Sequence, residues 1–346
     1  MDFNTSATAI GSFPHSDPVD CCQYIFKSFP EIPLWPQLSS LGIRENMYIQ
    51  FSEGLPFVKI DEAKKRMFFQ IPDDTATDLE RFYERILEQD LESFATTENH
   101  SNGLYAFLNL IEKDKAYISS AKYLKGQITG PISFGLTVTD QNNKSIFYID
   151  EMRDIIVKGL VMKAKWQIRK LKNYFPQVIL FVDEPYLVSL GSAFVSLDKQ
   201  EVIQYINEVI CGIHDEGAIA GIHCCGNTDW SVLMQTDVDI LSFDTYEYLD
   251  TLSLYTKDLA KFLERGSVLA WGIVPTSDKA IGENDRSLVD RLTKGIQKLV
   301  QKGLNEEKLL GASLITPSCG TGTLPVKLAE RIIELTKGVS FLLKSP

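Results

Sequence analysis

Short apolar runs rich in β-forming residues alternate along the chain with amphipathic helical stretches. This order is typical of an α/β protein with a parallel sheet. The predicted strands are Thr8–Phe13, Gly126–Thr129, Val178–Val182, Ala218–His223, Ile240–Phe243, Val268–Gly272 and Gly311–Ile315. The predicted helices are Thr77–Phe94, Asp150–Tyr174, Lys199–Glu216, Arg286–Lys302 and Pro325–Leu343. Because no predicted strand is followed by the fingerprint G-x-G-x-x-G, a doubly wound dinucleotide-binding sheet is the weaker alternative.

The length of the chain suits one barrel. It has 346 residues and contains no internal repeat, low-complexity segment or Pro/Gly/Ser-rich linker. We therefore predict a single-domain TIM (β/α)8 barrel over residues 1–346. The helical region around 73–122 is longer than a minimal βα unit needs, and we expect it to be an elaboration of the barrel.

The charge balance restricts the partners. With 35 basic and 46 acidic residues the formal charge is −11, which disfavours binding to nucleic acid or to an anionic membrane. No apolar run approaches the roughly 20 residues that span a bilayer, and the first four residues lack the basic start of a secretory signal. We expect a cytoplasmic protein in which the six cysteines are reduced thiols, used as metal ligands or as core residues.

Unusual polar groups follow six of the predicted strands. In a parallel barrel the carboxyl ends of the strands meet at one face, where the chemistry gathers. We therefore interpret these groups as parts of one site. They are Gly11-Ser12-Phe13-Pro14, Thr129-Gly130-Pro131, Asp183-Glu184-Pro185, His223-Cys224-Cys225, Asp244–Glu247 and Ser318-Cys319-Gly320.

The H-x-C sequence at 223–225 predicts a metal site. Alternate side chains of a strand point the same way, so His223 and Cys225 face one side while Cys224 faces the other. Imidazole and thiolate together suit zinc. Glu247 and Cys319 come where neighbouring strands would deliver two further ligands, although a solvated acid and a small buried thiol are the alternatives for them.

Five motifs of this chain resemble the catalytic half of cobalamin-independent methionine synthase. The resemblance spans nearly the whole chain, and the H-x-C, the later glutamate and the distal cysteine match the zinc ligands of that family in type and order. The motifs are Ala9-Ile10-Gly11-Ser12-Phe13-Pro14, Ile128-Thr129-Gly130-Pro131, Val182-Asp183-Glu184-Pro185, Ile222-His223-Cys224-Cys225 and Pro317-Ser318-Cys319-Gly320.

The resemblance implies a barrel enzyme of methionine biosynthesis, a zinc-dependent methyltransferase that methylates the thiol of homocysteine. Zinc would be held by His223, Cys225, Glu247 and Cys319. The amino-acid end of homocysteine would be held by Ile10, Gly11, Ser12 and Asp183, and Asp183 is also the expected catalytic residue. Glu53 is a further candidate for the amino group, with a solvated loop carboxylate as its alternative.

Two departures from the family concern the methyl donor. The family histidine of Y-D-I-H-S-P is missing where this chain reads Trp271-Gly272-Ile273-Val274-Pro275, and the family sequence L-K-T-R-G-W is replaced by Thr321-Gly322-Thr323-Leu324-Pro325. Methyl-folate needs a general acid for its amine leaving group, whereas a cobalt–methyl bond does not. We therefore expect methylcobalamin or a methylated corrinoid carrier protein as donor, as in the short "core" enzymes of the family.

Three other functions compete with this interpretation. A corrinoid-dependent enzyme that methylates coenzyme M would share the barrel and the thiol chemistry. A lyase that resembles uroporphyrinogen decarboxylase would share the barrel without a metal. A zinc-holding accessory protein is the non-enzymatic alternative, because four protein ligands resemble a structural zinc site.

Overall fold

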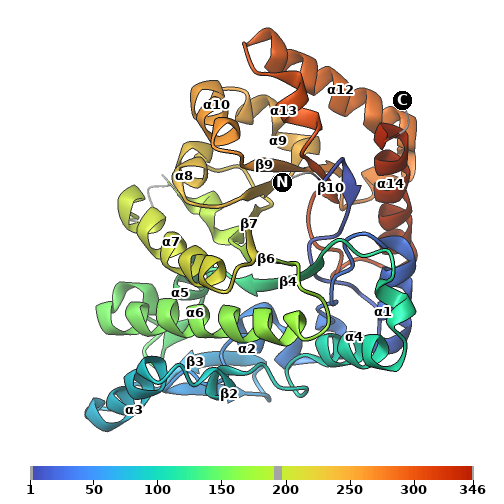
Figure 1. The fold of residues 1–346 in the computed structure, drawn as a ribbon. Helices are drawn as coiled ribbons and strands as arrows, with labels where there is room; N and C mark the ends of the chain where they lie inside the picture. Colours follow the sequence, from blue (N-terminus) through green and yellow to red (C-terminus); the bar gives the residue numbers. More distant parts are fainter. Residues whose placement is uncertain (1–2, 191–196, 345–346) are drawn as a thin grey trace.

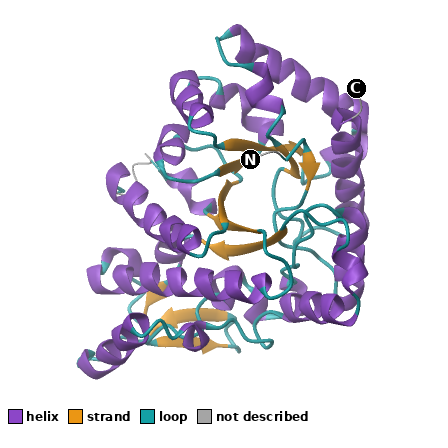
Figure 2. Cartoon of the chain, viewed as in Figure 1, coloured by secondary structure: helices purple, strands orange, loops and turns teal. Residues whose placement is uncertain are grey.

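The computed structural model describes residues 3–190 and 197–344. Its centre is a seven-stranded parallel sheet in the order β1-β10-β9-β8-β7-β6-β4. The strands are β1 (Ser6–Ala7), β4 (Leu124–Thr129), β6 (Val178–Asp183), β7 (Ile219–Cys224), β8 (Ile240–Phe243), β9 (Val268–Val274) and β10 (Leu314–Pro317). The sheet curls round a common centre, with the helices on its outside (Figures 1 and 2). The predicted α/β class with a parallel sheet is confirmed in this form.

Helices connect and cover the strands. In chain order they are α1 (Pro18–Ser28), α2 (Met47–Gln50), α3 (Ala76–Leu87), α4 (Asn102–Lys113), α5 (Pro131–Thr137), α6 (Asp150–Lys172), α7 (Lys199–Asp215), α8 (Trp230–Gln235), α9 (Thr245–Leu252), α10 (Thr256–Glu264), α11 (Lys279–Gly282), α12 (Asp285–Gln301), α13 (Glu306–Leu310) and α14 (Val326–Lys344). Among the described residues, no helix combines the length and the apolar character needed to cross a membrane.

The ladder is open between β1 and β4, so the predicted eight-stranded barrel is not a continuous one. The segment 33–37 lies in this gap and makes isolated parallel bridges to both sides, Leu34 with Lys125 and Gln37 with Ser12. Two prolines in this segment, Pro33 and Pro36, lack the N–H group that a ladder needs. The segment therefore spans the gap without forming a regular strand.

The predicted strand Thr8–Phe13 is the clearest local correction. Regular pairing is confined to Ser6–Ala7, which align with Leu314 and Ile315 of β10. Further on, the backbone bonds instead to the irregular segment, since Phe13 N–H donates to the Gln37 carbonyl and Gln37 N–H to the Gly11 carbonyl, each at 2.9 Å. Beyond Thr8, whose N–H donates to the Ile315 carbonyl of β10, the predicted strand therefore pairs with a segment that is not a regular strand.

The predicted helix Thr77–Phe94 is also interrupted. Helix α3 ends at Leu87, Gln89 takes a positive φ of 54°, and a short 3₁₀ helix, η3 (Leu91–Phe94), follows. A second sheet, not predicted, joins β2 (Val58–Asp61) and β3 (Arg66–Phe69) as an antiparallel hairpin to β5 (Thr139–Asp140). The hairpin and α3 lie beyond α6, away from the curled sheet (Figure 1). The role of region 73–122 stays a prediction.

Candidate metal centre and its surroundings

Strand alternation decides which side chains enter the centre of the curled sheet. A Cβ built on Gly221 would meet the Phe181 ring at 2.2 Å, so these two positions share a face. A Cβ on Gly126 would instead meet Gln167 of the surrounding helix α6 at 2.0 Å, so Gly126 faces outward. By alternation the inward-facing side chains are those of Lys125, Gln127 and Thr129 on β4, Phe181 and Asp183 on β6, and His223 on β7.

Three of the four predicted metal ligands come together at the ends of β7 and β10. The ligand atoms of His223, Cys225 and Cys319 lie within 4.8 Å of one another. Nδ1 of the buried His223 is 2.9 Å from Oγ of Ser242, and its Nε2 is buried without a hydrogen-bond partner. A buried imidazole nitrogen left free beside two thiols fits a zinc ion in type and number of donors.

The two thiols affect each other. The pKa of Cys225 is lowered, chiefly because it is hydrogen-bonded to Cys319 and also because His223 lies beside it. The same contact and burial raise the pKa of Cys319. One thiolate is thus favoured in the pair before any metal binds. By contrast Cys224 is fully buried on the outer face of β7, and its thiol points to the Gly226 carbonyl at 3.6 Å.

Glu247 is not brought to this group. Asp244 caps helix α9 by accepting from the Glu247 N–H at 2.9 Å, which fixes Glu247 in the first turn. Its side chain is 40% exposed and pairs with Lys279 of α11. Burial raises the pKa of Asp244 to about 6, and the charges of His223 and Cys225 also act on it. Glu247 as fourth ligand stays a prediction.

Asp183 lies inside the curled sheet beside His223, its register partner on β7. Its Oδ1 is buried without a hydrogen-bond partner, and burial raises its pKa to about 6 against the opposing charges of His223 and Lys125. Lys125 is completely buried, donates to the Ile10 carbonyl at 2.6 Å, and holds its Nζ 4.2 Å from the centre of the Phe181 ring. Sequence reasoning missed Lys125, which directly precedes the predicted strand Gly126–Thr129 and belongs to the longer observed strand β4.

The segment at 10–12 packs against the loop that carries Cys319. Thr321 donates to the Ser12 carbonyl through its N–H at 2.9 Å and its hydroxyl at 3.0 Å, and Gly322 N–H donates to Ser12 Oγ at 3.2 Å. The space at Gly11 is tight, because a Cβ there would lie 3.0 Å from Cδ of the Gln127 side chain. The predicted segment therefore borders both the Cys319 loop and the inner face of β4.

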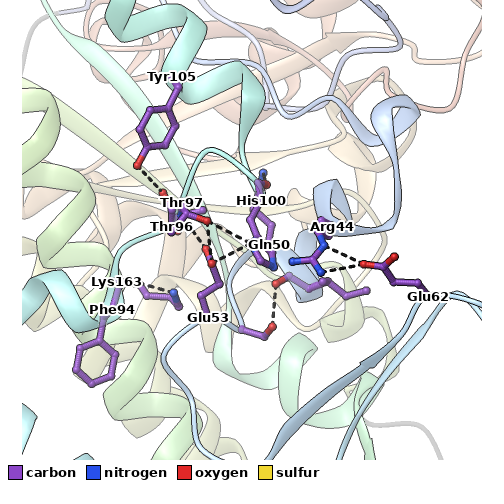
Figure 3. Close-up of polar contacts among 12 residues, drawn as sticks. Arg44, Gln50, Glu53, Glu62, Phe94, Thr96, Thr97, His100, Tyr105 and Lys163 are labelled. Atoms are coloured by element: carbon purple, nitrogen blue, oxygen red, sulfur yellow. Dashed lines mark hydrogen bonds and ion pairs between the residues drawn. The ribbon is translucent and has the colours of Figure 1, made fainter.

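Glu53 is held in a separate polar network, shown in Figure 3. Its carboxylate accepts from Thr97 N–H at 2.7 Å and Thr97 Oγ1 at 2.8 Å, and it pairs with Nδ1 of the buried His100 at 2.9 Å. These hydrogen bonds outweigh burial and lower its pKa. Glu53 is thus not a free loop carboxylate. Its use for a substrate amino group stays a prediction, and the partner His100 was not foreseen.

Glu184, next to Asp183, has an internal role. It is completely buried and accepts from Ile132 N–H at 2.9 Å, Ser133 N–H at 2.8 Å and Ser133 Oγ at 2.6 Å. These groups open helix α5, where N–H groups lack partners within the helix. The second acid of Asp183-Glu184-Pro185 therefore joins β6 to α5, while the first faces the metal group.

Replacing Lys125 with methionine is expected to change how stability depends on pH. Burial lowers the pKa of Lys125 from 10.5 to about 7, with Asp183 opposing the shift. Between these values the folded chain binds fewer protons than the unfolded chain, so the stability of the natural protein rises with pH from about 7 to 10.5. Urea unfolding at pH 7 and 9.5 should show a smaller rise in Lys125→Met. An unchanged rise would contradict the assignment, and Lys294→Met on the surface of α12 is the control.

Comparison with known proteins identifies no family for this chain. No protein-family model matches it, and no curated protein matches it either. One similar solved structure is a B12-independent methionine synthase from Shewanella sp. W3-18-1 in complex with selenomethionine, at 15% identity and a TM-score of 0.45; the match covers 67% of this chain and 66% of that one. Another is the pneumococcal virulence factor StrH, at 11% identity and a TM-score of 0.43, with 98% and 84% covered. Since such weak likenesses carry no argument about activity, the site itself has to support the function.

Proposed function

We propose that this chain is a zinc-dependent methyltransferase that methylates the thiol of homocysteine to give methionine. The observation that carries the proposal is the group of His223, Cys225 and Cys319, with one imidazole nitrogen buried and unpartnered. These residues would hold the zinc, and Glu247 or Asp244 would be the candidate for a fourth donor. The curled sheet together with segment 33–37 would act as the (β/α)8 barrel of a single domain.

Zinc in this group would act as a Lewis acid and lower the pKa of an added thiol. The chain supplies the surroundings. Ser242 orients His223 by its contact with Nδ1, which leaves Nε2 for the metal. The two cysteine sulfurs bring negative charge, which favours electron density on the substrate sulfur. Asp183 and the segment at 10–12 border the same space and would bind the amino-acid end of homocysteine.

The proposed donor is methylcobalamin, or a methylated corrinoid held by a carrier protein. In this reaction a sulfur–carbon bond forms as the cobalt–carbon bond breaks. Both electrons of the broken bond stay on cobalt, and the thiol proton is released to water. No proton has to be delivered to the leaving group, which agrees with the missing family histidine at 271–275. We also propose that a carrier protein presents the corrinoid to this chain and that the reaction takes place in the reducing cytoplasm.

The test is methyl transfer by zinc-loaded protein from methylcobalamin, with homocysteine and coenzyme M as competing acceptors. We expect methionine to form, detected by mass spectrometry, and formation to stop when a chelator removes the metal. Methylation of coenzyme M in preference to homocysteine would overturn the assigned substrate. Decarboxylation of uroporphyrinogen by metal-free protein would overturn the reaction class.

A further inference from the structure

Three polar atoms beside the metal group are buried without any hydrogen-bond partner among residues 3–190 and 197–344. They are Oε1 of Gln127, Oγ1 of Thr129 and Oδ1 of Asp183. Leaving a buried acceptor unpaired costs about 1–3 kcal/mol each. Three such atoms on two adjacent strands together destabilise the empty site. This pattern is typical of a binding site in which a ligand supplies the missing hydrogen-bond donors.

The three side chains enter the same space. Thr129 and Asp183 are register partners on β4 and β6, and Gln127 lies two residues before Thr129 on the same face of β4. Gln127 also touches the segment predicted to bind substrate, since its Cδ limits the space at Gly11. The side chains of Gln127, Thr129 and Asp183 therefore form a row that extends from the segment at 10–12 to the metal group.

The orientation of the Gln127 amide is set by the hydrogen bond that its nitrogen atom makes. Its Nε2 donates to the Trp35 carbonyl at 3.2 Å, in the segment that spans the gap of the sheet. Turning the amide over would place two oxygens against each other. Oε1 is therefore the unpartnered atom of the amide and an acceptor, as are the Asp183 carboxylate oxygen and the Thr129 hydroxyl.

We propose that Gln127, with Thr129 and Asp183, binds the primary ammonium group of the ligand and makes the site selective for amino-bearing thiols. An ammonium group carries three N–H donors and one positive charge. It matches three acceptors, of which one is a carboxylate. Gln127 is the specificity-determining residue of the set. The inference rests on the proposed function for the thiol, but it assigns a residue and a contact that the function alone does not require.

Lys125 does not fill this place. Its Nζ donates to the Ile10 carbonyl and lies over the Phe181 ring, and none of the three acceptors is its hydrogen-bond partner. Its charge would oppose a second cation if it were fully protonated. Burial, however, lowers the pKa of Lys125 to about 7, so deprotonation near neutral pH relieves the repulsion.

The experiment compares thiols that differ only in the amino group. Binding to zinc-loaded protein is measured by calorimetry for homocysteine, cysteine and cysteamine, and for their counterparts 4-mercaptobutanoate, 3-mercaptopropanoate and ethanethiol. We expect the natural protein to prefer at least one amino thiol over its counterpart. Gln127→Leu should lose about 10- to 100-fold in affinity for that amino thiol and keep its affinity for the counterpart.

Two matched pairs of variants separate the contact from a packing effect. Gln127→Glu and Gln127→Leu both lose the bond to Trp35, but only the former keeps an acceptor, so it should keep the preference. Thr129→Ser should keep the preference for the amino thiol, and Thr129→Val should weaken it. This pair tests the set of three acceptors even if a Gln127 variant fails to fold. Circular dichroism melting checks that each variant is folded.

Two results would overturn the inference. One is a natural protein that does not distinguish any amino thiol from its counterpart. The other is an equal loss for both thiols in Gln127→Leu and in Thr129→Val. A clear preference for the amino thiol without methyl transfer would overturn the proposed function and leave the ammonium site in place, so the two failures are distinguishable.

Discussion

Cys225→Ser and Cys319→Ser are each expected to weaken zinc binding by at least about 100-fold and to abolish methyl transfer to homocysteine. A serine hydroxyl stays protonated at neutral pH and is a poor ligand for zinc, so only two donors of the group would remain. Zinc content after dialysis against a graded chelator gives the affinity, and methionine formation gives the activity.

Cys224→Ala is the matched control, because it removes a neighbouring sulfur on the outer face of the same strand. Cys224 is fully buried among core residues and points to Gly226. We expect some loss of stability but full zinc content. If Cys319→Ser kept zinc with unchanged affinity, the metal site would have to lie elsewhere and the proposed chemistry would lose its basis.

Glu184→Ala is expected to destabilise the fold by roughly 3–5 kcal/mol. The change removes the carboxylate that accepts from the Ile132 and Ser133 N–H groups at the start of α5 and leaves a cavity in a fully buried place. Urea unfolding followed by circular dichroism measures the loss. A change below 1 kcal/mol would show that water or backbone shifts replace the carboxylate.

The pH dependence of stability gives a second test at Glu184. Burial raises its pKa from 4.5 to about 7, while the hydrogen bonds from Ile132 and Ser133 oppose the shift. Between these pH values the folded chain keeps a proton that the unfolded chain has lost, so stability falls as pH rises through the window, by up to roughly 3 kcal/mol.

Glu184→Gln should flatten this fall between pH 4.5 and 7. Glutamine has about the same shape and does not titrate, but offers one acceptor to two amide groups. A uniform loss of about 1–3 kcal/mol is therefore expected at every pH. The difference in slope between the two proteins is the diagnostic quantity, since other groups titrate equally in both. Equal slopes would show that Glu184 is ionised throughout the window.

Much of the metal group could be predicted from the sequence, because the H-x-C pattern that indicates it lies within one strand. Alternation along a strand places His223 and Cys225 on one side and Cys224 on the other, whatever the rest of the chain does. Cys319 could be added because parallel strands end at one face of a sheet. The structure places the Cys319 sulfur within 4.8 Å of the ligand atoms of His223 and Cys225.

Glu247 shows where such reasoning stops. Its distance along the chain from the preceding strand is suitable, but the Asp244 cap turns the chain into α9 and Lys279, 32 residues later, takes the carboxylate. Glu53 is similar, because its partner His100 lies 47 residues further along in another loop. Neither partner can be read from the neighbouring sequence.

The sequence by itself determined the α/β class, the alternation of faces within each strand and the chemical types available at the strand ends, because these depend on neighbours a few residues apart. Only the tertiary structure decided that segment 33–37 spans the gap in the sheet, that Lys125 is enclosed against Ile10 and Phe181, and that the Gln127, Thr129 and Asp183 acceptors stay unpaired. Whether a polar atom is paired depends on which distant segments close over it, and that is settled by the packing of the whole chain.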